Sequence, residues 1–253
     1  MSTSPALALA LIALADDHLI LGHRLSEWCG HAPMLEEDLS MPNMALDMMG
    51  QARNLYTYAG ELEGQGRDED DLAYLRTDRE YKNCLLVERP NGDFAHTMLR
   101  QLYFAAFMQP FWEAAAATSS DEKVRGFAEK AVKEIAYHIR HAGEWVIRLG
   151  DGTDESAGRM RDAVDALHIY TDELFCITDD MKQCVEAGIL PDPAAMRAPW
   201  NQTIEHIFNE AFLTIPEVPF PQEGGRDGRH TEGFGHLLSE LQYMQRTYPG
   251  MTW

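Results

Sequence analysis

The fold is decided by residues 93–152, which read DFAHTMLRQLYFAAFMQPFWEAAAATSSDEKVRGFAEKAVKEIAYHIRHAGEWVIRLGDG. Asp93 follows a stretch of tight-turn residues, 89–92, and can cap a helix that continues to about residue 117. Residues 119–122 have capping-box spacing and open a second helix, which we expect to end at the glycines of residues 150–152. Two long helices with so short a connector favour an antiparallel pair that buries one apolar stripe of each helix.

The rest of the chain has the same helical character. Strand signals are weak, because alternating β-branched runs bounded by two-residue turns are missing. We expect further helices over residues 5–29, 37–62, 70–88 (broken or continuous), 154–177, 180–186, 193–213 and 236–248, with Pro42 disturbing the second and a long irregular loop over 215–235. The sequence therefore predicts an all-α fold: one domain over residues 1–253, an antiparallel four-helix bundle with additional C-terminal helices.

Charge and cysteine content narrow the function. The chain carries 21 Lys and Arg against 41 Asp and Glu, a formal net charge of −20, which repels phosphate backbones and anionic lipid. We therefore expect no nucleic-acid and no membrane partner. The four cysteines are scattered without C-x-x-C spacing, which argues against a zinc motif or a disulfide framework and favours a reducing cytoplasm.

The apolar run over residues 6–15 superficially suggests a secretory leader. No Lys or Arg precedes it, and its helical periodicity continues past residue 20, so we interpret it as part of a mature helix. By our reading no apolar stretch reaches the ~20 residues that a membrane span requires.

Two motif-like segments lie midway along long predicted helices. Di-iron bundle proteins place Glu-x-x-His on each of two helices, because positions i and i+3 share a helix face. Gln51-Ala52-Arg53-Asn54 and Glu134-Ile135-Ala136-Tyr137 have this shape with substitutions. Amide and phenol groups are poor substitutes for carboxylate and imidazole, and the upstream segments 19–21 and 102–105, where partner acids would lie, are apolar. The degenerate di-iron positions are Gln51, Asn54, Glu134 and Tyr137, and we expect no metal, cofactor or catalytic residue in this chain.

Other interpretations stay open. Both motifs are also common strings of surface polarity. Glu134, His138 and His141 fall at i, i+4 and i+7 on one helix face, which would suit a di-iron oxygenase acting alone. Arg226, Arg229 and His230 make a local basic patch that could meet the phosphate of an acyl-CoA or an acidic partner.

Longer blocks of sequence carry a family resemblance. The chain closely resembles the structural C subunits of bacterial phenylacetyl-CoA epoxidases, enzymes of phenylacetate catabolism. The resemblance covers nearly the whole chain, through residues 24–33, 46–54, 88–94, 149–153, 230–232, 242–246 and 249–253.

This resemblance implies a ferritin-like fold and a non-catalytic, supporting role. It also implies a hetero-oligomer with a homologous catalytic A subunit, which carries the di-iron centre and the phenylacetyl-CoA pocket. Other epoxidase subunits and a second copy of this chain are alternative partners. The D-E-x-R-H motif of active relatives stands here as Gly50-Gln51-Ala52-Arg53-Asn54, which keeps only the arginine. No catalytic residue can therefore be carried over.

Overall fold

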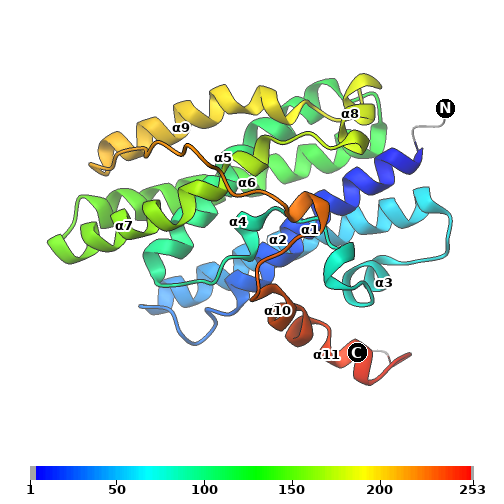
Figure 1. Cartoon of the computed structure of the whole chain (residues 1–253), viewed down its shortest axis with the longest axis horizontal. Helices are drawn as coiled ribbons and strands as arrows, with labels where there is room; N and C mark the ends of the chain where they lie inside the picture. Colours follow the sequence, from blue (N-terminus) through cyan, green and yellow to red (C-terminus); the bar gives the residue numbers. More distant parts are fainter. Residues whose placement is uncertain (1–3, 252–253) are drawn as a thin grey trace. The chain divides into compact units, whose positions relative to one another are not determined.

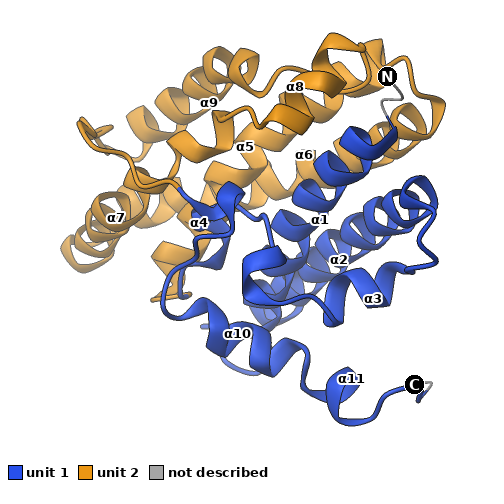
Figure 2. Cartoon of the chain, turned by 45° about the vertical axis from the view of Figure 1, so that its right-hand side comes forward, with its two compact units in different colours: residues 1–90, 224–253 blue, residues 91–223 orange. Residues whose placement is uncertain are grey.

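The computed structural model describes residues 4–251, and every regular element within that range is a helix (Figure 1). The prediction of an all-α fold with the helix complement of a ferritin-like bundle is confirmed. The chain divides into two compact units: unit 1 contains residues 1–90 and 224–253, and unit 2 contains residues 91–223 (Figure 2).

Unit 1 is built on a pair of packed helices, α1 (Ser4–Ser26) and α2 (Leu35–Glu63). The two helices approach closely at Gly22, where an added Cβ would lie 3.1 Å from the Cβ of Met48. Pro42 lies inside α2 without ending it, although its missing N–H removes one backbone hydrogen bond of the helix. Gly64, in the left-handed conformation that glycine tolerates, ends α2.

Short elements complete unit 1. The helix expected over residues 70–88 is broken into three pieces: α3 (Glu69–Tyr74), the 3₁₀ turn η1 (Asp78–Glu80) and α4 (Leu85–Glu88). Asp68 begins α3 and Thr77 begins η1, each with a capping box. These local side-chain hydrogen bonds favour two separate short helices over one continuous helix. The chain returns to unit 1 through η5 (Gly225–Asp227), α10 (Phe234–Leu241) and α11 (Tyr243–Thr247).

Unit 2 contains the helix pair predicted from residues 93–152. Helix α5 (Phe94–Thr118) begins where the Asp93 side chain accepts the His96 amide, 3.0 Å away, as expected. Helix α6 (Glu122–Gly150) is capped by Asp121, which accepts the Val124 amide at 3.0 Å, whereas the Ser119 hydroxyl donates to the Ile189 carbonyl at 2.6 Å. The capping-box prediction was therefore right about the helix start but wrong about the cap.

Two of the remaining helices of unit 2 are shorter than expected. The helix predicted over 154–177 is α7 (Asp154–Leu167) followed by two 3₁₀ turns, η2 (His168–Tyr170) and η3 (Asp172–Phe175). Helix α8 (Asp179–Glu186) matches its prediction, and the helix expected over 193–213 is η4 (Pro193–Met196) plus α9 (Arg197–Glu210).

Helix α1 corrects one expectation. Its 23 residues are long and apolar enough to cross a membrane by length and composition, contrary to our reading of the sequence. Asp16 and Asp17 are the acidic residues of this helix. In this structure 83% of the most apolar stretch of α1 is buried, as expected for a core helix.

Candidate functional site

The four degenerate di-iron positions differ in their surroundings. In unit 1, α2 buries Gln51 and leaves Asn54 exposed. In unit 2, α6 leaves Tyr137 37% exposed, and Glu134, partly exposed, lies 3.6 Å from Lys130 Nζ. Residues three apart on a helix are offset by about 60°, so the edge of the buried stripe of α2 passes between positions 51 and 54. Of these four degenerate positions only Gln51 is buried.

These four groups do not fit a di-iron centre. A buried amide, an exposed amide and a phenol offer iron weaker donors than the acids and imidazoles of such sites. Residues 4–251 also include no group of three or more His, Cys, Asp and Glu side chains that could hold a metal ion. No chemical step through iron is derived for this chain.

The alternative metal set on α6 is likewise not assembled. His138 is fully buried and its Nδ1 lies 3.2 Å from Nε2 of Gln101 on α5. Its neighbour His141 is half-buried, and its ring lies 5.8 Å from the ring of Tyr137. His138 thus takes part in the packing of α5 against α6.

Unit 1 instead contains a buried ionic cluster that our sequence reasoning missed. Asp16, in the middle of α1, is fully buried and accepts hydrogen bonds from the Tyr56 hydroxyl at 2.5 Å and the Lys82 amide at 2.7 Å. It also forms an ion pair with the Arg76 guanidinium. Burial alone would lower the pKa of Arg76, but the charge of Asp16 holds it above its usual range. Asp16 therefore ties α1 to α2 and to the segment after α3.

The neighbouring Asp17 holds the returning chain. Its carboxylate accepts from the Arg226 guanidinium and from the Cys84 amide, each at 2.7 Å. Burial raises the pKa of the Asp17 carboxyl, and the opposite charge of Arg226 partly offsets that rise. Arg226 also donates to the Lys82 carbonyl at 2.9 Å, so one cation joins α1, the segment before α4 and η5.

Glu88 is the third buried acid of the cluster. It accepts from the Thr231 amide at 2.6 Å and from the Asn83 side chain at 2.9 Å. Nδ1 of His230 lies 2.6 Å from Glu88, and its Nε2 lies 3.0 Å from the Tyr81 carbonyl oxygen. A carbonyl and a carboxylate can only accept, so the doubly protonated, cationic form of His230 satisfies both contacts.

The pKa of His230 follows from this geometry. Burial lowers the pKa of the imidazole, but the hydrogen bond and the charge of Glu88 raise it more, so the net pKa lies above its ordinary value. The ring also stacks on Phe234, with centroids 4.1 Å apart.

This cluster changes the interpretation of the basic loop. Arg226 and His230 have side-chain exposures of 13% and 5% and are paired inside unit 1. Arg229 is exposed but contacts Asp227 at 2.8 Å. Most of the basic patch predicted at residues 224–230 therefore forms buried ion pairs that hold the C-terminal segment against the rest of unit 1. Its signal in the sequence was the Asp16-Asp17 pair inside an apolar helix, since buried acids require internal partners.

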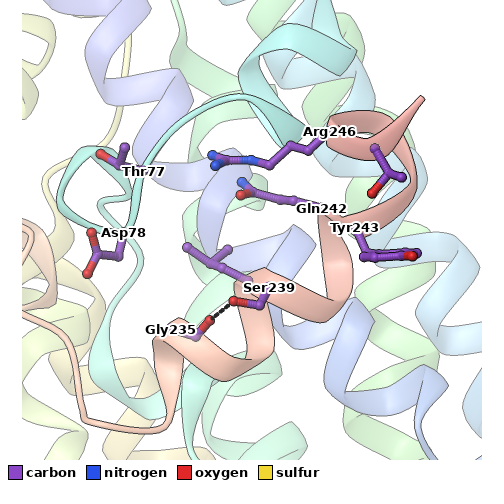
Figure 3. A pocket seen from close by; sticks show the side chains of 9 residues that line it. Thr77, Asp78, Gly235, Ser239, Gln242, Tyr243 and Arg246 are labelled. Atoms are coloured by element: carbon purple, nitrogen blue, oxygen red, sulfur yellow. Dashed lines mark hydrogen bonds between the residues drawn. The ribbon is translucent and has the colours of Figure 1, made fainter. Parts of the chain in front are cut away.

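Unit 1 also has an open pocket of about 410 Å³ between η1 and the last two helices (Figure 3). Arg246 reaches across it and donates to the carbonyls of Tyr74, Leu75 and Arg76, the last at 2.9 Å. Gln242 donates to Arg76 as well, also at 2.9 Å. These side chains satisfy the exposed carbonyl end of α3, so the polar lining of the pocket has a structural role.

A second cavity, of about 310 Å³, lies in unit 2 beside the proline-rich segment 216–220. His168 lines it, and its Nδ1 lies 3.0 Å from the Tyr103 hydroxyl. Burial lowers the pKa of His168, which favours the neutral ring. Neither cavity assembles a recognisable acid, base and nucleophile.

Comparison with known proteins agrees with the resemblance seen in the sequence. A family model described as phenylacetic acid catabolic protein matches residues 2–253. The C subunit of the 1,2-phenylacetyl-CoA epoxidase of Escherichia coli (strain K12) is 44% identical over 246 residues, which are 96% of this chain and 97% of that relative. The chain therefore belongs to the phenylacetic acid catabolic protein family.

Proposed function

We propose that this chain is the non-catalytic structural subunit of a phenylacetyl-CoA epoxidase, a ring 1,2-monooxygenase of aerobic phenylacetate catabolism. In this role it binds and supports a catalytic A subunit that carries the di-iron centre. The chain itself forms one ferritin-like domain in the cytoplasm and holds no cofactor. Its similarity to the C subunit of such an epoxidase, over nearly its full length, supports this assignment.

The observation that carries the proposal is that the buried acids are already paired with groups of this same chain. Asp16, Asp17 and Glu88 are carboxylates of unit 1 that are at most 1% exposed, and each accepts hydrogen bonds from the chain's own main-chain amides and cations. The negative charges of these acids are offset by Arg76, Arg226 and His230, so no metal ion is needed to balance them. These acids therefore support a structural role for the chain.

Two rival functions have less support. A di-iron oxygenase acting alone would need Glu134, His138 and His141 to converge, and residues 4–251 contain no such group. An acyl-CoA delivery module would need free cations at residues 224–230, where Arg226 and His230 face internal acids.

Reconstitution tests the proposal. The catalytic A subunit, loaded with iron and supplied with reductase, is assayed for oxygen-dependent conversion of phenylacetyl-CoA with and without this chain. We expect the two chains to co-elute on size exclusion and turnover to require both. Turnover by this chain without the A subunit, or no association between the two, would overturn the proposal.

A further inference from the structure

An unusual apolar stripe runs along the outer face of the first half of α2. Leu35, Leu39 and Leu46 are 70%, 59% and 65% exposed. With the half-buried Pro42 and Met49 they follow spacings of four, three, four and three residues. That is the a/d pattern through which one helix packs along another. We call these five residues and Gly50 the α2 docking face.

Gly50 is an independent sign that something else packs there. It lies in the middle of α2, where glycine costs helix stability relative to alanine. Apart from its own stretch of helix, a Cβ at this position would meet no described atom within 4 Å, so packing against the rest of the chain does not require the glycine. A glycine on the outer face of a helix does, however, let a second backbone approach closely.

The charge around the face indicates the character of its partner. Residues 32–53 include four acids, Glu36, Glu37, Asp38 and Asp47, and one cation. That cation is Arg53, which continues the stripe one step beyond Met49 and is paired with Glu69 at 3.0 Å. Glu36 is exposed and Asp38 and Asp47 are half-buried, so the rim of the apolar stripe is negative. A second copy of this chain would bring the same acids and a net charge of −20 to the contact.

We propose that the α2 docking face is the surface on which a helix of the catalytic A subunit packs, with an apolar stripe of its own and a rim of Lys or Arg. This assignment rests on the proposed function and locates its interface. The leucines supply buried apolar area, Gly50 permits close approach, and the acidic rim selects a basic partner.

The first test is Leu46→Arg in the full-length chain, with binding to the purified A subunit measured by calorimetry. An arginine would place an unpaired charge in the centre of the interface and face a basic rim, so we expect the Kd to rise at least about tenfold. Leu9→Arg is the matched control, because Leu9 is a leucine on α1 with 49% exposure. We expect the control to bind like the wild type and both variants to keep the wild-type Tm.

The second test is Gly50→Ala, for which we expect higher thermal stability but weaker binding to the A subunit. Alanine is the better helix former, so the Tm of the isolated chain should rise. The added methyl group would obstruct the close approach of a partner backbone, so binding to the A subunit should weaken. If Gly50 had a purely structural role, the variant would not combine a higher Tm with weaker binding.

The outcomes separate the interface from the proposed function. If the wild-type chain binds the A subunit and Leu46→Arg binds equally well, the docking face is wrong and the supporting role stands. If the wild-type chain does not bind the A subunit, the proposed function itself fails, and the interface with it. If Leu46→Arg abolishes a homodimer of the wild-type chain, the face belongs to a second copy and the proposal is overturned.

Discussion

The two units of the chain differ in the side chains that they bury. Unit 1 encloses ion pairs, of which Asp16–Arg76 has side-chain exposures of 0% and 5%. Unit 2 packs aromatic rings: Phe107 stacks on Phe111 at 5.8 Å, and Trp200 donates to the Tyr103 carbonyl at 2.9 Å. Ion pairs of unit 2 such as Arg197–Asp172 lie nearer the surface, with 38% and 37% exposure.

The difference reflects how each unit is connected. Unit 2 is one continuous stretch whose long helices are joined by short loops, and its helices pair mainly through apolar stripes, although Arg100 and Glu173 are buried there as well. Unit 1 is made of two separate stretches, and residues 224–253 must pack against residues 1–90. Directional charge-assisted bonds from Arg226 and His230 fix where that segment lies, which apolar contacts alone specify less well.

Asp16→Ala tests this contrast with the largest expected effect. The variant leaves the Arg76 guanidinium buried without its counter-ion, so we expect a loss of about 3–5 kcal/mol in the free energy of unfolding. Urea unfolding at neutral pH measures it. Asp172→Ala, which breaks a half-exposed pair in unit 2, is the control and should cost about 0–1 kcal/mol. Equal losses in the two variants would remove the distinction between the units.

His230→Phe is expected to have the next largest effect. Phenylalanine keeps the stacking on Phe234 but removes both N–H donors, which costs about 1.5–3 kcal/mol at pH 6.

The pH dependence of the stability difference between wild type and His230→Phe shows whether the positive charge of His230 contributes to stability. A histidine whose pKa is raised in the folded state stabilises fully below its unfolded pKa of about 6.5, and this stabilisation is lost as the pH rises through the folded pKa. The difference in unfolding free energy between wild type and variant should therefore narrow above about pH 6.5. A difference that stays constant from pH 6 to 9 would show that His230 acts only through packing.

Phe111→Leu sharpens the comparison from the side of unit 2. Phe111 is fully buried among aromatic rings, and exchange for another large apolar side chain should cost about 1 kcal/mol. No ionisable group changes, so we expect the same loss at pH 6 and pH 9. Urea unfolding at both values measures it, and a marked pH dependence would contradict a purely apolar role.

Asn54→Ala should have the smallest effect. Asn54 is exposed on α2, and alanine is the better helix former, so we expect a gain of at most about 0.5 kcal/mol in unfolding free energy. The turnover of the reconstituted epoxidase should not change. A large loss of turnover would show that this degenerate position has a role which its exposure does not suggest.

Helical periodicity and capping residues predicted the long helices well. The Asp93 cap and the short connector before α6 placed the α5–α6 pair, because these signals are local. The segment between residues 68 and 88 was harder to predict. Its three short pieces are held by long-range bonds such as those from the Lys82 and Cys84 amides to the acids of α1, which no local pattern reveals.

The candidate site was predicted in part. Ligand chemistry at Gln51 and Asn54 indicated a lost metal site, but the exposure of Asn54 depends on the position of the buried stripe, which the motif does not specify. Partner acids were expected near residues 19–21, so Asp16 and Asp17 had no predicted role. Their partners Arg76 and Arg226 lie 60 and 209 residues further along the chain, beyond the reach of spacing rules.

Iron binding by the purified full-length chain tests the central claim most directly. The chain is loaded anaerobically with Fe(II), desalted, and measured by metal analysis and Mössbauer spectroscopy, with the A subunit as positive control. We expect only substoichiometric iron without a coupled signal in this chain, and a coupled iron pair in the A subunit. A stoichiometric, coupled iron pair in this chain would contradict the account of it as a supporting subunit.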